Sequence, residues 1–181
     1  MKYNKTWTIT EYLLNNPGKR IKVTYVAKEL KVSKASVSLT VKELAEDGIV
    51  KGLYIDMKSP RTRAFKIMIN VNSIVKNGVI EALKKYALGI GLYGSWVKGT
   101  NTEDSDIDIW IKPKYMLKQS GTAILSKEIR ERLGVDAEVL ILSKVINSAS
   151  AALLVSSCSI QFAQGCTGVA LSGFAFVGTR Y

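Results

Sequence analysis

Histidine is absent from this chain of 181 residues. Its absence excludes Ser-His and Cys-His nucleophilic catalysis, histidine metal sites and histidine general bases. Any chemistry must therefore use carboxylates, Lys and Arg side chains, hydroxyls or backbone groups. Cysteine is almost as scarce, because only Cys158 and Cys166 occur and their spacing is not CxxC. Free thiols in an intracellular protein are favoured over a disulfide scaffold.

Charge is missing from one end of the chain, since residues 145–179 include no Asp, Glu, Lys or Arg. Gln161, Gln164 and many Ser and Gly residues interrupt its apolar runs, which disfavours a membrane span. We expect residues 145–181 to be buried against a sheet or in a homo-oligomer interface. A shifted reading frame is a third interpretation. The N-terminus lacks the apolar region of a signal peptide, so a cytoplasmic protein is expected.

Acidic residues are scarce in the first half of the chain. Residues 1–86 carry 17 Lys and Arg against 7 Asp and Glu, whereas residues 87–181 carry 9 against 8. A basic front half indicates a polyanionic partner, chiefly nucleic acid. A solvated lysine-rich surface is the alternative interpretation.

Apolar periodicity predicts three helices in the first domain, residues 1–72. They cover residues 8–18, 22–32 and 32–50. Thr8 or Thr10, then Thr24, then Ser33 are the candidate N-caps. The short connection between the second and third helices is typical of a helix-turn-helix.

Two strands, at 48–56 and 64–71, are predicted to follow around a basic turn at 57–63. The arrangement resembles the winged helix-turn-helix of MarR-type regulators, in which the third helix enters the major groove of DNA and the wing follows the backbone. On this resemblance the DNA-binding residues are Ser33, Lys34, Ser36, Ser38, Thr40 and Lys42 in the helix, with Lys58, Arg61 and Arg63 in the wing. A pure protein-interaction module is the alternative.

Alternating elements predict an α/β (α+β) second domain with a mixed sheet flanked by helices, over residues 73–144. A linking helix is expected at 73–86 and a longer helix at 116–134. The three expected strands cover 87–94, 106–112 and 136–143.

Two carboxylates stand out in the strand at 106–112. Side chains alternate along a strand, so Asp106, Asp108 and Trp110 share one face and the intervening isoleucines share the other. Like charges so close favour a bound cation, and hard oxygen ligands suit Mg²⁺ or Mn²⁺. Trp110 either stacks a nucleobase or belongs to the core.

Gly94 and Ser95 end the preceding strand where the chain must turn, and such a turn suits a phosphate. The Gly-Ser pair followed by Asp106-Ile107-Asp108-Ile109 resembles the signature of the DNA polymerase beta-like nucleotidyltransferase superfamily. With the winged helix, the chain looks like the regulator-nucleotidyltransferase fusions of archaea. The superfamily adds a third carboxylate, here Asp136 or Glu138.

The resemblance implies that two metal ions and an NTP, with ATP favoured, bind at these carboxylates, and that Gly94, Ser95 and Lys98 hold phosphates. Lys98 is equally well explained as a solvated lysine. A nucleotide would pass to a protein or nucleic-acid acceptor, supplied by a partner because the chain is short. The alternative is a DNA-binding regulator whose second domain senses nucleotide or pairs with a partner without catalysis.

Overall fold

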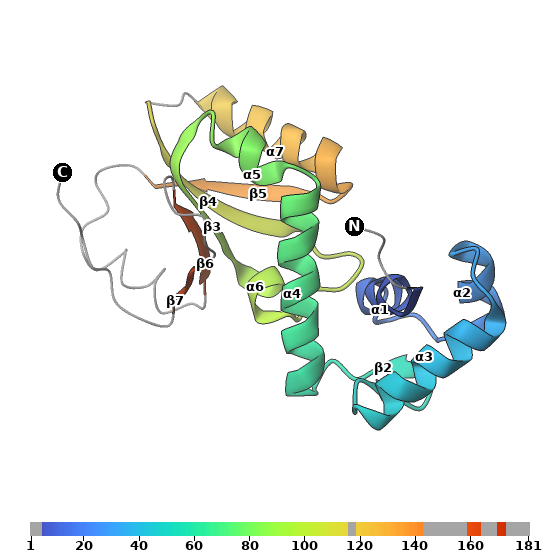
Figure 1. Cartoon of the computed structure of the whole chain (residues 1–181). Coiled ribbons are helices and arrows are strands. Elements are labelled where there is room, and N and C mark those ends of the chain that lie inside the picture. Colours follow the sequence, from blue (N-terminus) through green and yellow to red (C-terminus); the bar gives the residue numbers. More distant parts are fainter. Residues whose placement is uncertain (1–4, 116–118, 143–158, 164–169, 173–181) are drawn as a thin grey trace. The chain divides into compact units, whose positions relative to one another are not determined.

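The structure, a computed structural model, describes residues 5–115, 119–142, 159–163 and 170–172 (Figure 1). The chain divides into two compact units. The first comprises Met1–Ile69 together with Gly99–Asp104, and the second comprises Asn70–Lys98 together with Ser105–Tyr181. The two units are described separately below.

Within its described residues, the first unit contains three helices, a short hairpin and the beginning of a fourth helix. The three helices and the two hairpin strands are α1 (Lys5–Asn15), α2 (Val23–Glu29), α3 (Lys34–Glu46), β1 (Val50–Lys51) and β2 (Tyr54–Ile55). The core contains apolar residues of every helix, including Ile9, Leu13, Val26, Val37 and Leu44. The predicted helix-turn-helix arrangement is confirmed.

The predicted helix starts were right only for α3. Ser33 is its N-cap, and the Ser33 hydroxyl accepts a hydrogen bond of 3.1 Å from the backbone N–H of Ser36. The Thr24 cap was wrong, because α2 starts after Lys22 and has no side-chain cap. Thr8 and Thr10 lie inside α1, so neither of them caps it.

The predicted position of the wing at the basic turn 57–63 was wrong, and so was its second strand at 64–71. Residues 60–76 instead form one long helix, α4 (Pro60–Lys76), and the only hairpin of the described first unit turns at Gly52 and Leu53. Proline is well suited to the first turn of a helix, where its missing N–H leaves no bond unmade. The linking helix predicted at 73–86 is also divided, because α4 ends at Lys76 and α5 spans Val79–Leu83.

A buried lysine on α4 organises polar groups inside the first unit. Lys66 is 1% exposed, and its ammonium donates a hydrogen bond of 3.0 Å to Oδ1 of Asn15. Burial lowers the pKa of Lys66 to about 8, partly offset by the nearby carboxylate of Glu103. Glu103 also lies beside Gly18, where a Cβ would be 3.2 Å from its Oε1.

The second unit is built on a mixed five-stranded sheet of order β5-β4-β3-β6-β7 (Figure 1). Its strands are β3 (Ala87–Tyr93), β4 (Ile107–Pro113), β5 (Ala137–Ile141), β6 (Ser159–Ala163) and β7 (Ala170–Ser172), and its other helices are α6 (Gly94–Lys98) and α7 (Gln119–Leu133). Among the strands that the structure describes, only β4 and β5 run parallel to each other, because α7 connects them as a crossover. The predicted mixed sheet flanked by helices is confirmed.

One face of this sheet is the core of the unit. Ile107, Ile109 and Ile111 of β4 are at most 2% exposed, as are Leu125 and Ile129 of α7. The alternation predicted from the sequence therefore places the isoleucines inward. The residues between them, which include Asp108, face the other side of the sheet.

The uncharged residues 145–179 lie largely outside the described part of the chain. Within it they contribute β6, which pairs antiparallel with β3, and β7 at the edge. Their predicted burial stays a prediction. Among the described residues, no helix combines the length and the apolar character that crossing a bilayer requires.

Candidate active site

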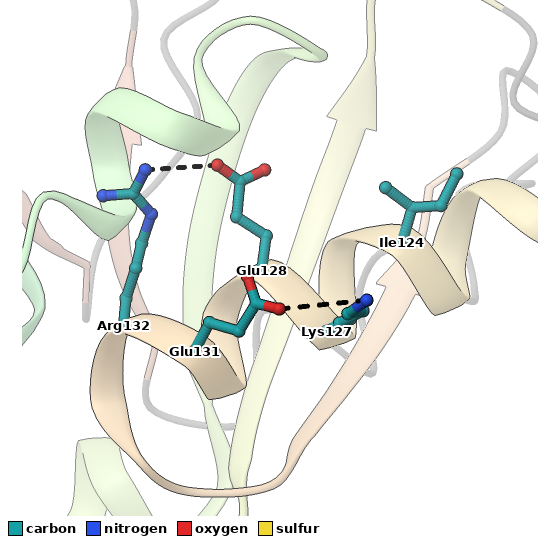
Figure 2. Close-up of a pocket in the computed structure, with 5 residues that line it drawn as sticks. All are labelled: Ile124, Lys127, Glu128, Glu131 and Arg132. Carbon is teal, nitrogen blue, oxygen red and sulfur yellow. Dashed lines mark hydrogen bonds and ion pairs between the residues drawn. The ribbon is translucent and has the colours of Figure 1, made fainter.

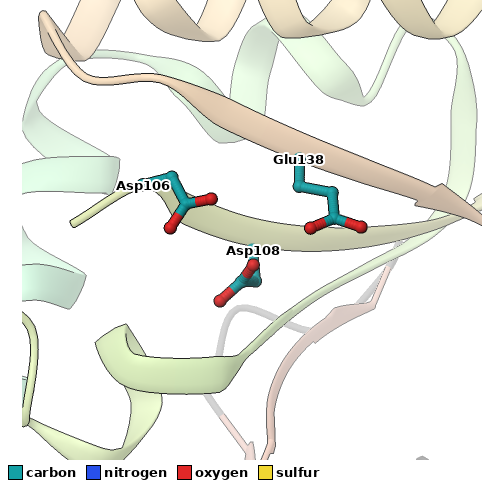
Figure 3. A group of neighbouring side chains, drawn as sticks. All are labelled: Asp106, Asp108 and Glu138. Atoms are coloured by element: carbon teal, nitrogen blue, oxygen red, sulfur yellow. The ribbon is translucent and has the colours of Figure 1, made fainter.

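Three carboxylates converge at the beginning of β4. Asp106 directly precedes the strand, Asp108 lies within it, and Glu138 lies on β5 as the register partner of Asp108. One oxygen from each carboxylate lies within 4.8 Å of the others (Figure 3). Of the two later carboxylates that the sequence offered, the geometry therefore brings Glu138 together with Asp106 and Asp108.

Asp136, the other candidate, has a different partner. Its carboxylate forms an ion pair with the guanidinium of Arg130 on α7. Asp136 precedes β5, and its backbone carbonyl accepts a hydrogen bond of 2.8 Å from Ile107. The structure therefore does not bring the Asp136 side chain into the carboxylate cluster.

The turn after β3 fits against this cluster. Gly94 has a φ of +69°, and a Cβ built on it would overlap the Asp108 carboxylate. The backbone N–H of Ser95 donates a hydrogen bond to Asp108. The Asp108 carboxylate thus packs directly against Gly94 and accepts a hydrogen bond from Ser95.

Electrostatic repulsion is concentrated on Asp108. Burial raises its pKa, and the negative charges of Asp106 and Glu138 raise it further, whereas the Ser95 hydrogen bond opposes them. Burial, with the same three carboxylates, also raises the pKa of Tyr93 to about 12. Tyr93 is the register partner of Asp108 on β3 and was not singled out from the sequence.

The donor set fits a hard divalent cation. Three carboxylates supply only oxygen ligands, and their mutual repulsion is what a bound cation would relieve. Within the described residues none of the three carboxylates forms an ion pair with a basic side chain, because the ion pairs of this unit involve other acidic residues. Asp106, Asp108 and Glu138 could therefore hold Mg²⁺ or Mn²⁺.

Ser95 and Lys98 lie on the same short helix, α6. Ser95 is partly buried in its first turn, and Lys98 is its exposed last residue. Nothing in the geometry distinguishes a phosphate-binding Lys98 from a solvated one. Its role stays a prediction.

A hollow of about 360 Å³ lies away from the carboxylates, on the outer side of α7. It is lined by Ile124, Lys127, Glu128, Glu131 and Arg132 (Figure 2). Its charged groups pair along the helix, with Lys127–Glu131 at 3.9 Å and Glu128–Arg132 at 3.2 Å. Such i, i+4 pairs are ordinary surface features of helices, so the hollow carries no functional assignment.

Five of the six residues predicted to contact DNA from the third helix are exposed or partly buried, and their contacts with DNA stay a prediction. Ser33, Lys34, Ser38 and Lys42 are exposed and Ser36 is partly buried. Thr40 is corrected, because it is 2% exposed and belongs to the core.

The three basic residues that were predicted to lie in the wing lie instead around the beginning of α4. Lys58 precedes α4, and Arg61 and Arg63 lie in its first turns. Arg61 forms an ion pair of 2.7 Å with Asp47, and Arg63 donates a hydrogen bond of 3.1 Å to the carbonyl of Met57. These contacts engage both arginines within the first unit.

Two parts of the chain match known protein families. Residues 76–151 match the family described as "Nucleotidyltransferase domain". The chain carries a nucleotidyltransferase domain. Residues 10–52 match "Iron dependent repressor, N-terminal DNA binding domain". A helix-turn-helix DNA-binding domain therefore precedes the nucleotidyltransferase domain, and the match supports neither the MarR-type nor the archaeal assignment.

No curated protein matches the chain significantly. A solved structure described as "Crystal structure of the toxin-antitoxin with AMP-PNP" aligns with 52% of this chain and 73% of its own, at 22% identity and a TM-score of 0.41. A likeness at that level supports no conclusion about activity.

Proposed function

We propose that the chain is a metal-dependent nucleotidyltransferase that transfers a nucleoside monophosphate from an NTP to a macromolecular acceptor, and that its helix-turn-helix domain binds DNA. The observation that carries the proposal is the cluster of Asp106, Asp108 and Glu138 against the Gly94-Ser95 turn. The family match of residues 76–151 supports the same class of reaction.

The proposed reaction is one displacement at phosphorus. A hydroxyl oxygen of the acceptor forms a bond to the α-phosphorus, the bond from that phosphorus to the bridging β-oxygen breaks, and pyrophosphate leaves while the hydroxyl proton passes to solvent. Divalent cations, when bound, would neutralise charge on the phosphates and lower the pKa of the hydroxyl. Covalent catalysis is not required, which suits a chain without histidine.

The chain's own residues act by holding and positioning. Asp106, Asp108 and Glu138 supply the negative oxygens that retain the cations, and the Ser95 N–H fixes the Asp108 carboxylate. The Ser95 hydroxyl and Lys98 are proposed to contact the phosphates. Gly94 keeps the turn close to Asp108, so that phosphates and cations meet at one point.

Label transfer tests the proposal. The full chain is incubated with Mg²⁺ or Mn²⁺ and each NTP, labelled either at the α- or at the γ-phosphate, with and without cell extract. We expect the α-label to appear on protein or nucleic acid and the γ-label to leave as pyrophosphate. Appearance of the γ-label on the acceptor, with the α-label left in the nucleoside diphosphate, would indicate transfer of the γ-phosphate instead.

Two matched variants identify the third carboxylate. Glu138→Gln and Asp136→Asn each replace one carboxylate by an amide on the same strand segment, and only Glu138 lies in the cluster. We expect transfer to fall by at least about 100-fold in Glu138→Gln and to persist in Asp136→Asn. The reverse result would place Asp136 in the site. NTP binding without transfer in the unmodified chain would favour the nucleotide-sensing regulator.

A further inference from the structure

Trp110 lies beside the carboxylate cluster on the same face of the sheet. It follows Asp108 by two residues on β4, and side chains two residues apart share a face. Successive residues on that face lie about 6.6 Å apart along the strand. The indole therefore occupies the next position along the strand from the metal-binding oxygens of the proposed site.

Two glycines on β3 determine how the indole lies. Gly91 is the register partner of Trp110, and a Cβ built on Gly91 would overlap atoms Cε2, Cζ2 and Nε1 of the indole. A Cβ on Gly89 would lie 3.6 Å from Cζ3 at the other end of the ring. The indole thus lies over the glycine backbone of β3 and extends from Gly91 toward Gly89, in the direction that leads away from the cluster.

The surroundings of the indole are apolar yet accessible. Leu140, the register partner of Trp110 on β5, is 37% exposed, and Trp110 itself is only partly buried. On the opposite face the β4 isoleucines are completely covered. An apolar aromatic surface that adjoins three carboxylates matches a ligand with a planar apolar part next to an anionic part.

We propose that Trp110 is the stacking platform for the base of the NTP, and that it makes the site prefer purine nucleotides. The inference rests on the proposed function and names its substrate class. A nucleoside triphosphate has the required form, because its phosphates would lie at the cluster while ribose and base extend from them. Stacking accepts any base but strengthens with ring area, so a purine gains more than a pyrimidine.

Equilibrium binding to the full chain in Mg²⁺ tests the inference without any transfer reaction. Affinities are measured by calorimetry for ATP, GTP, CTP, UTP and inorganic tripolyphosphate, and tryptophan fluorescence is followed in parallel. We expect both purine nucleotides to bind more tightly than the pyrimidine nucleotides, and tripolyphosphate most weakly. Trp110→Leu should weaken ATP on the order of 10-fold while leaving tripolyphosphate unchanged.

Two further variants control the measurement. Trp110→Phe keeps a smaller ring and should give an intermediate ATP affinity. Trp7→Phe removes a tryptophan of the first unit and should leave the nucleotide-dependent quenching intact, whereas Trp110→Leu should reduce it to the contribution of Trp96 on α6. Circular dichroism of each variant confirms that it is folded.

Several outcomes would overturn the inference. Equal affinity of the unmodified chain for ATP and tripolyphosphate would show that the base is not bound, and this comparison needs no variant. Equal weakening of both ligands by Trp110→Leu would show a structural role. If Trp110→Leu leaves the ATP affinity unchanged but impairs transfer, Trp110 contacts the acceptor and not the base. Failure of the unmodified chain to bind any NTP would instead overturn the proposed function itself, and the inference with it.

Discussion

Gly94 shows how much one residue constrains the site. Its φ of +69° favours glycine, and the Asp108 carboxylate occupies the space that a Cβ would need. Gly134, in the same unit, has a similar φ of +71° with nothing within 4 Å of its Cβ position. A comparison of Gly94 with Gly134 therefore distinguishes the effect of a positive φ from the effect of the close contact with Asp108.

Gly94→Ala should lower transfer by about 100-fold, because it displaces Asp108 from its position against the turn. Gly134→Ala should retain transfer and cost only about 1–2 kcal/mol of stability, since it strains the backbone alone. Rates of label transfer and unfolding midpoints of both variants give the comparison. If both variants lose transfer equally, the close contact between Gly94 and Asp108 has no specific role in transfer.

Lys66 is a buried cation whose charge disfavours the folded first unit. Its pKa falls from 10.5 to about 8 on burial. Below pH 8 the lysine is charged in both states, so the folded state carries the full desolvation cost. Between pH 8 and 10.5 the folded state releases its proton first, and stability therefore rises with pH.

Lys66→Met removes this titration while retaining an unbranched chain. The stability of the variant relative to the unmodified protein should be highest below pH 8 and should fall by about 3 kcal/mol by pH 10.5. Denaturant unfolding followed by circular dichroism at several pH values measures the difference, with exposed Lys28→Met as a control. A difference that does not vary with pH would contradict it.

At the scale of elements, α4 explains the main error of the sequence interpretation. Residues 64–71 are rich in apolar and β-branched residues, which favours a strand. Their burial nevertheless follows a helical period, with Thr62, Lys66 and Ile69 buried and Met68 at 46% exposed. The helical period was not recognised in the sequence because Lys66 occupies a buried position, where an apolar residue is normally expected.

By contrast, the bounds of α3 could be predicted from residues at its two ends. Ser33 caps it, and Gly48, with a φ of +69°, follows it. Those signals involve residues near in sequence, so they need no tertiary information. The helical period of α3 also indicates the burial of Thr40, which lies three residues after Val37 and four before Leu44 on the face that the core covers, so its assignment to DNA was an error of the sequence interpretation.

At the scale of the whole molecule, the carboxylate cluster should couple metal binding to stability. A cation that binds only the folded state stabilises it by about 2.7 kcal/mol at 100 times its dissociation constant. Mg²⁺ or Mn²⁺ should therefore raise the unfolding midpoint of the unmodified protein by several degrees.

Asp108→Asn should abolish this shift and should leave the metal-free protein at least as stable at neutral pH, since one of three like charges is gone. The stability linked to the raised pKa of Asp108 is present at low pH and lost as pH rises through that pKa. Differential scanning calorimetry with and without metal measures both effects, and Asp136→Asn serves as the control. A metal-dependent shift that persists in Asp108→Asn would remove the cluster as the binding site.

The sequence by itself determined the helix-turn-helix, the alternation of β4, and the pairing of Gly94-Ser95 with Asp106 and Asp108. Each depends on residues close in sequence or on the fixed period of a strand. Only the tertiary structure decided that Glu138 rather than Asp136 joins the cluster, because the register of β5 places Glu138 beside Asp108 and the Asp136 carboxylate pairs with Arg130 of α7. The tertiary structure also decided that residues 60–76 form a helix and that the Trp110 indole packs on Gly89 and Gly91. Both depend on contacts between segments that are distant in the sequence.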